Sequence, residues 1–126
     1  MRVLIVEPDK SLGLLWSRHL ERSGAIVTHV TGQADAIRAI RDEDVSIIVL
    51  NLVLPGDSAF AIADYASYAA PDTKVIFVTA SSFFSDGSIF RHIPNACAFV
   101  GASTPPEDLA AMAMHWGGST REVGRA

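Results

Sequence analysis

The chain has 126 residues, of which 49% are hydrophobic and 19% charged, and its formal net charge is -4. This length suits one domain and is too short for two, and the apolar content excludes a disordered polar chain. Neither end has a run of Lys or Arg, so we expect no nucleic-acid partner.

The cellular compartment is predicted from the absence of a membrane span, a signal peptide and paired cysteines in the sequence. No apolar segment approaches the roughly 20 residues needed to cross a bilayer, and Val3–Val6 is too short for the apolar region of a signal peptide. Cys97 is the single cysteine, which excludes an intramolecular disulfide and is typical of a reducing compartment. We therefore expect a cytoplasmic protein with no membrane partner, in which Cys97 packs as a small core residue.

In chain order, the first half alternates strand and helix patterns. Val3–Val6 is an apolar run without polar alternation, typical of a strand covered on both faces. A helix follows, with one face formed at three- and four-residue spacing by Leu12, Leu15, Trp16, His19 and Leu20. The next strand, Ala25–Val30, is diluted by Thr28 and His29 and is expected at an edge. A second helix is expected around Ala36–Ile40.

The second half continues this alternation. Ile47–Leu50 and Val75–Val78 predict two more central strands, with a helix around Phe60–Ala66 between them. A short helix is expected near Ser88–His92, followed by an edge strand at Ala96–Val100.

The last helix begins with a capping pattern. Thr104–Glu107 combines a hydroxyl residue, two prolines and a glutamate three positions on. Its apolar face consists of Leu109, Met112, Ala113 and Trp116. We expect Gly117-Gly118 to end the helix, which gives one domain over residues 1–117 and a flexible tail over residues 118–126.

Strict alternation of strands and helices predicts an α/β fold, a doubly wound five-stranded parallel sheet with helices on both faces. The flavodoxin-like order 2-1-3-4-5 suits strands of which the first, third and fourth are the most apolar. Such sheets bind ligands outside the carboxyl ends of their strands. The residues placed there are Glu7, Pro8, Asp9, Asn51, Thr79 and Ala102.

Four motifs occur in one order: VLIVEPDKSL, VSIIVLNLVLPG, VIFVTA and CAFVGASTPPEDL. Together they resemble the receiver domains of two-component response regulators, from Met1 to about Trp116. In that family an acidic pair after the first strand holds Mg²⁺, and an aspartate that ends the third strand attacks a phosphoryl donor. A hydroxyl after the fourth strand and a lysine after the fifth bind the phosphoryl group.

Three of these five positions have lost their chemistry. The resemblance assigns Glu7 and Pro8 to the acidic pair, Asn51 to the phosphoacceptor, Thr79 to the hydroxyl and Ala102 to the lysine. An acyl phosphate needs a carboxylate nucleophile, which the amide of Asn51 does not offer. Without the carboxylates lost at Pro8 and Asn51, we expect no cofactor and at best weak metal binding by Glu7 and Asp9.

The remaining losses act on charge. Ala102 leaves the phosphoryl pocket without its cation. With fewer carboxylates in the pocket, the repulsion between like charges is weaker. We therefore expect a more stable domain that is held in one conformation.

Several of these residues have simple structural explanations. Glu7 is as readily interpreted as a solvated carboxylate, and Asp9 as the N-cap of the first helix. The Asn51 amide is expected to hydrogen-bond across its loop. The Thr79 hydroxyl is expected to have a hydrogen-bond partner within the protein. Phe99 matches the family's switch aromatic, with its rotamer left open by the sequence.

Other polar and aromatic residues are weighed in the same way. Of the adjacent Phe83 and Phe84, we expect one to cover the vacant pocket and the other to face a partner. The histidines lack metal-ligand spacing, so we interpret all four as surface or core residues: His19, His29, His92 and His115.

These observations predict a degenerate receiver without enzymatic activity that signals by protein–protein contact. Expected partners are a histidine kinase, a phosphotransferase or an output regulator. A second copy is also possible, through the face of the fourth helix, fifth strand and fifth helix that the resemblance implies. That face includes Phe99, Leu109, Met112 and Trp116 or their exposed neighbours.

Two alternatives stay open. The first is a flavin- or nucleotide-binding module on the same fold, although no Gly-rich loop follows the first strand. The second is a phosphoacceptor that uses a displaced carboxylate such as Asp57, for which a helix cap is the simpler explanation.

Overall fold

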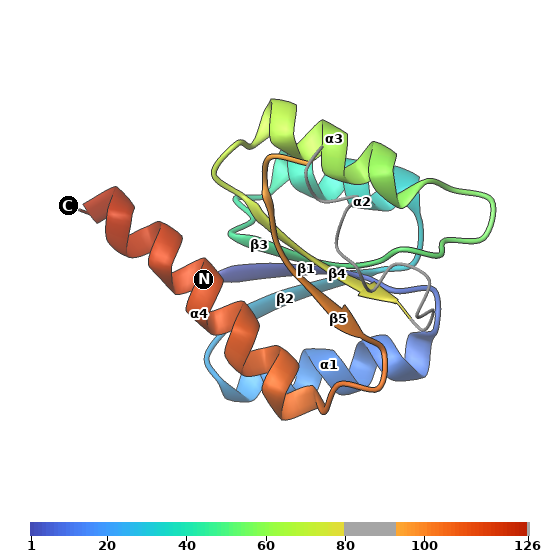
Figure 1. Ribbon diagram of the computed structural model, residues 1–126, viewed down its shortest axis with the longest axis horizontal. Coiled ribbons are helices and arrows are strands. Elements are labelled where there is room, and N and C mark those ends of the chain that lie inside the picture. The colour runs from blue at the N-terminus through green and yellow to red at the C-terminus, as the bar shows by residue number, and fades with distance from the viewer. Residues whose placement is uncertain (80–92, 126) are drawn as a thin grey trace.

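The computed structural model describes the backbone of residues 1–79 and 93–125 and the side chains of residues 1–79 and 93–118. The five strands are β1 (Arg2–Val6), β2 (Ile26–Val30), β3 (Ile47–Asn51), β4 (Lys74–Thr79) and β5 (Ala96–Gly101). The helices of this part of the chain are α1 (Lys10–Arg22), α2 (Gln33–Asp42), α3 (Ala59–Ala69) and α4 (Pro106–Arg125). All strands are parallel, in the order β2-β1-β3-β4-β5 (Figure 1). The predicted fold class and strand order are confirmed.

Helices cover both faces of the sheet, α2 and α3 on one side and α1 and α4 on the other (Figure 1). Successive residues of β1 alternate between the two layers: Leu4 packs with α2 and α3, whereas Val3 and Ile5 pack with α1 and α4. This burial on both faces explains why the central strands are continuous apolar runs. β2 and β5 are only partly buried and lie at the edges, as predicted.

The first helix presents a different face to the core than the sequence pattern predicts. Asp9 is its N-cap, as expected, and Leu15 is 43% exposed, which contradicts the prediction for that residue. The small residues Gly13 and Ser17 are buried instead. A Cβ at Gly13 would collide with the His29 imidazole, so this glycine lets α1 approach β2 closely.

The predicted end of the last helix at Gly117-Gly118 is wrong, because α4 continues to Arg125. A glycine that closes a helix adopts positive φ, and among the described residues only Gly24 and Gly56 do so. Gly117 has a packing role, since a Cβ there would collide with the sulfur of Met1. Residues 118–125 of the expected tail therefore extend the helix in Figure 1.

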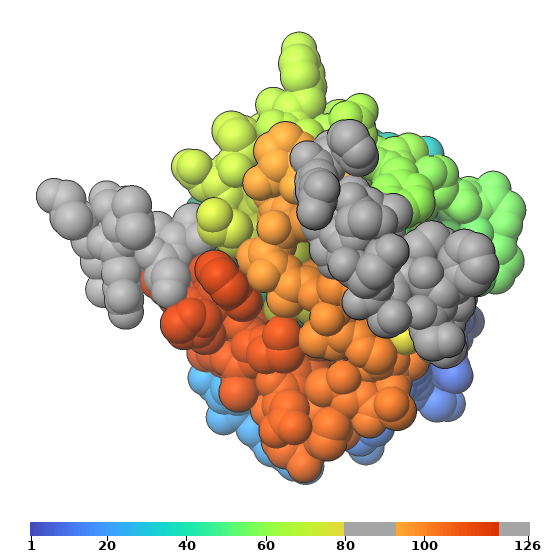
Figure 2. All heavy atoms as spheres, in the orientation of Figure 1, coloured from blue at the N-terminus to red at the C-terminus, as the bar shows by residue number. Residues whose placement is uncertain are grey.

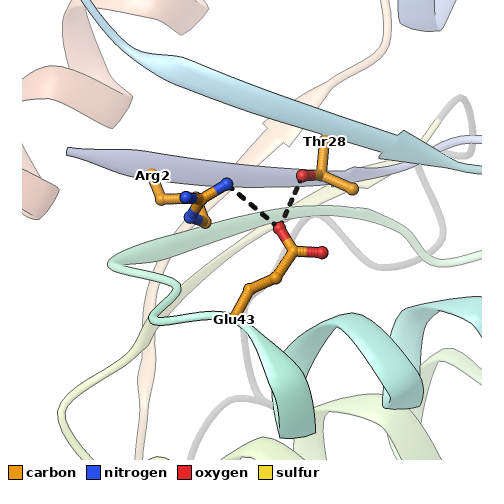
Figure 3. A network of polar contacts seen from close by, with 3 residues as sticks. All are labelled: Arg2, Thr28 and Glu43. Carbon is orange, nitrogen blue, oxygen red and sulfur yellow. Dashed lines mark hydrogen bonds and ion pairs between the residues drawn. The ribbon is translucent and has the colours of Figure 1, made fainter.

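A polar network fastens the loop after α2 to the sheet (Figure 3). One carboxylate oxygen of Glu43 accepts hydrogen bonds from the Thr28 hydroxyl at 2.7 Å and from Arg2 at 3.3 Å. The contact joins the loop to β1 and β2, and its partial exposure limits its energy to about 1 kcal/mol.

The remaining predictions concern single residues and segments. Burial raises the pKa of the Cys97 thiol to about 11, in agreement with its expected packing role. Phe83, Phe84, His92 and the expected helix at Ser88–His92 lie outside the described residues. No helix in residues 1–79 or 93–125 has the length and apolar character required to cross a membrane.

Candidate functional site

The parallel register gathers the predicted pocket residues at one edge of the sheet. Val6 pairs with Leu50, and Asn51 pairs with Val78, so the carboxyl ends of β1, β3 and β4 finish side by side. The backbone N–H of Ala102 donates to the Thr79 carbonyl at 2.9 Å and brings the segment after β5 to the same edge.

Glu7 lies at the centre of this edge and is only 2% exposed. One carboxylate oxygen accepts from Asn51 Nδ2 at 2.8 Å and the other from the backbone N–H of Asp9 at 2.9 Å. The expected solvated carboxylate is therefore wrong. A buried carboxylate needs such donors, because burial removes its hydration.

Asn51 uses both ends of its amide. While Nδ2 donates to Glu7, Oδ1 accepts from the backbone N–H of Val53 at 2.8 Å. The predicted hydrogen bond across the loop is confirmed. An ionised aspartate could accept from Val53 but could not donate to Glu7.

The side-chain oxygens at this edge do not fit the Mg²⁺ that the resemblance implies. Mg²⁺ needs several oxygen ligands, yet the oxygens of Glu7 and Asn51 already accept hydrogen bonds, and Pro8 has no side-chain oxygen. Asp9 Oδ1 accepts from the N–H groups of Ser11 and Leu12 as the helix cap. Among the described residues there is no cluster of three His, Cys, Asp or Glu side chains that could hold a metal.

Of the two positions that bind the phosphoryl group in the family, residue 79 keeps its hydroxyl, whereas residue 102 has no lysine. Thr79 is 3% exposed, so the hydroxyl residue of the family pattern lies within the protein at the end of β4. Ala102 packs against the apolar cluster beneath α1 and α4. Its methyl group provides no positive charge toward the Asn51 end of the sheet.

The N-cap of α3, the helix that follows Asp57, is Ser58, so the expected cap is wrong for that helix. Asp57 instead binds the start of α2. Its Oδ2 accepts from the Gln33 N–H at 2.8 Å, and Gln33 Oε1 accepts in return from the Ser58 N–H at 2.9 Å. Sequence reasoning missed this reciprocal pair because Gln33 and Ser58 are 25 residues apart. The two bonds fasten the loop before α3 to the start of α2.

His29 also lies close to the pocket, which its spacing did not indicate. Its Nε2 is 3.0 Å from the Glu7 carbonyl oxygen, and the Glu7 N–H donates to Val30 at 3.0 Å. These contacts hold the end of β1 against β2 and help to fix the Glu7 backbone.

The predicted interaction residues do not form one surface. Leu109 is 2% exposed and belongs to the core beneath α1 and α4, where Met112 and Trp116 also pack. Phe99 packs against the cluster on the opposite side of the sheet. Leu109 is therefore a core residue that covers the sheet, and a face on α4 would consist of its exposed neighbours, such as Asp108 and Ala111. Figure 2 shows β5 and α4 both contributing to one face of the molecule.

The structure has a surface hollow of about 500 Å³ at the opposite edge of the sheet. It lies near the ends of α2 and α3, and Arg41, Asp44 and Thr73 are among the residues that line it. Doubly wound sheets bind flavins and nucleotides at the carboxyl ends of their strands. The hollow therefore gives no support to a ligand site at the predicted crevice.

No protein-family profile matches the chain. Response regulator receiver protein CpdR of Brucella abortus is 30% identical over 78 residues, or 62% of this chain, which spans 65% of that relative's length. A response regulator receiver domain protein from Methanospirillum hungatei superposes with a TM-score of 0.86, at 21% identity over 96% of both chains. The signal receiver domain of a Luxo repressor protein from Vibrio parahaemolyticus also gives 0.86, at 25% identity over 98% of this chain and 94% of that chain.

Proposed function

We propose that this chain is a receiver domain of the response-regulator type that signals independently of phosphorylation. It acts by contact with other proteins of a two-component or related regulatory system. One observation supports this most strongly: Asn51 stands where the phosphoacceptor would be, and both ends of its amide are engaged. An amide has no ionised oxygen with which to form an acyl phosphate.

Two further substitutions favour the same proposal. Pro8 removes a carboxylate from the site of the metal, and Ala102 removes the cation that would stabilise a transferred phosphoryl group. The nucleophile, the metal site and the phosphoryl clamp are thus all altered. Reversal of one substitution alone would leave the other two deficits in place.

Incubation of the full chain with a small phosphodonor and Mg²⁺, followed by intact-mass measurement, tests this proposal. We expect no mass gain on the wild-type chain, while an active receiver treated in parallel shows that the donor works. A hydroxylamine-sensitive phosphoryl adduct on the wild type would contradict the proposal. Its loss in Asp57→Asn would then favour the displaced-carboxylate alternative.

A partner captured from native extract permits a second test. Binding to a histidine kinase, a phosphotransferase or an output regulator is expected to be the same with and without the phosphodonor. A partner that binds only after phosphodonor treatment of this chain would contradict phosphorylation-independent signalling.

A further inference from the structure

We propose that the Asn51 carboxamide takes the place of a bound divalent cation. It satisfies the buried Glu7 carboxylate and joins the carboxyl ends of β1 and β3, so the pocket keeps its structure without metal. This inference concerns the stability of the fold and does not depend on the proposed signalling function.

The first step is the requirement of Glu7 for a partner. Its carboxylate is almost fully buried, and none of the ion pairs found among the described residues includes it. The His29 ring contacts the main-chain oxygen of Glu7 and not the carboxylate. Among residues 1–79 and 93–118, the side-chain donor to Glu7 is Asn51, which acts together with the backbone N–H of Asp9.

The second step is the chemistry that residue 51 must provide. It has to donate to Glu7 and accept from the Val53 N–H at the same time, and a carboxamide does both. An aspartate would place a second carboxylate where Nδ2 now lies 2.8 Å from Glu7. Two like charges at this separation repel each other unless a cation lies between them or one carboxylate takes up a proton.

The third step follows from these two. Because the amide needs no counter-ion, the wild-type domain should not respond to Mg²⁺. Asn51→Asp should create a pair of carboxylates on β1 and β3, which are ligands that Mg²⁺ prefers. The wild-type residue is therefore a structural compensation as well as a lost nucleophile.

Thermal unfolding of the full chain, in EDTA and in millimolar MgCl₂, tests this inference with four proteins. The wild type is expected to unfold at the same temperature in both buffers. Asn51→Asp is expected to lose at least about 5 °C in EDTA and to recover part of this loss in MgCl₂. Asn51→Leu, the uncharged control, should be destabilised but insensitive to MgCl₂.

The double variant Glu7→Gln/Asn51→Asp exchanges amide and carboxylate. The new amide at residue 7 can donate to the new carboxylate, so this protein should recover most of the stability that Asn51→Asp loses, already in EDTA.

Three results would overturn the inference: stabilisation of the wild type by MgCl₂, an unchanged melting temperature for Asn51→Asp in EDTA, or no recovery in the double variant. If Asn51→Asp fails to fold in EDTA, the wild type and the double variant still decide the question. No phosphodonor or partner enters the assay, so its outcome is separate from that of the proposed function.

Discussion

At the scale of single residues, close packing explains Gly13, and hydrogen bonding explains Asn51 at the position of the phosphoacceptor. Gly13 allows the His29 ring to lie against α1, and the same ring contacts the Glu7 carbonyl. Asn51 completes the environment of Glu7 on the other side. The pocket thus depends on a small residue, Gly13, and on the amide of Asn51.

Gly13→Ala tests the close approach of α1 to β2. The added Cβ would collide with the half-buried His29 ring, and such overpacking destabilises a fold by about 1–3 kcal/mol. Urea denaturation measures the change.

Gly118→Ala is the matched control, because nothing lies within 4 Å of its added Cβ. Since it replaces a glycine within a helix, it should stabilise the domain by up to about 1 kcal/mol. Equal stabilisation by both variants would contradict the packing role of Gly13.

At the scale of secondary-structure elements, the loops at the carboxyl edge are fastened at both ends. The loop after β3 begins with the Asn51–Val53 hydrogen bond and ends with the reciprocal contacts among Asp57, Gln33 and Ser58. Fixed ends restrict the rearrangements available to this loop. This restriction is consistent with the proposed signalling without phosphorylation.

Asp57→Ala should remove the cap from α2 and destabilise the domain by about 1 kcal/mol. Chemical denaturation measures this loss. Asp64→Ala on α3 is the matched control, because Asp64 is exposed and its carboxylate has no hydrogen bond among the described residues. If the two variants had the same stability, the cap would contribute nothing measurable.

The elements themselves were largely predictable, and the reasons are physical. Continuous apolar runs marked the central strands because both faces of β1, β3 and β4 are buried. The end of α4 was predicted wrongly because Gly117 and Gly118 lie within the helix and do not adopt the positive φ of a closing glycine. Leu15 was wrongly predicted to lie on the buried face of α1, because this helix buries the small residues Gly13 and Ser17 instead.

The chemistry of the candidate site was predicted less fully than its location. The motifs placed Glu7, Asn51, Thr79 and Ala102 at one edge of the sheet. The register of β1, β3 and β4 confirms this for Glu7, Asn51 and Thr79. The burial of Glu7 was missed because its donor Asn51 is 44 residues away in sequence. Such a contact is decided by the register of two strands and leaves no local sequence pattern.

At the scale of the whole molecule, the sheet and its two helical layers resemble those of receiver domains, and we propose that the pocket does not support phosphorylation. The Glu7–Asn51 contact joins the two strands that frame the switch point of the sheet. We therefore expect the domain to hold one conformation in the presence of phosphodonor and Mg²⁺. Its partners would recognise this single state.

The most direct measurement is a pair of ¹H–¹⁵N NMR spectra of the full chain, without and with a phosphodonor plus Mg²⁺. Our account predicts superimposable spectra, including the side-chain amide signals of Asn51. Displaced signals for Glu7, Asn51 and Val53 that require both reagents would contradict it.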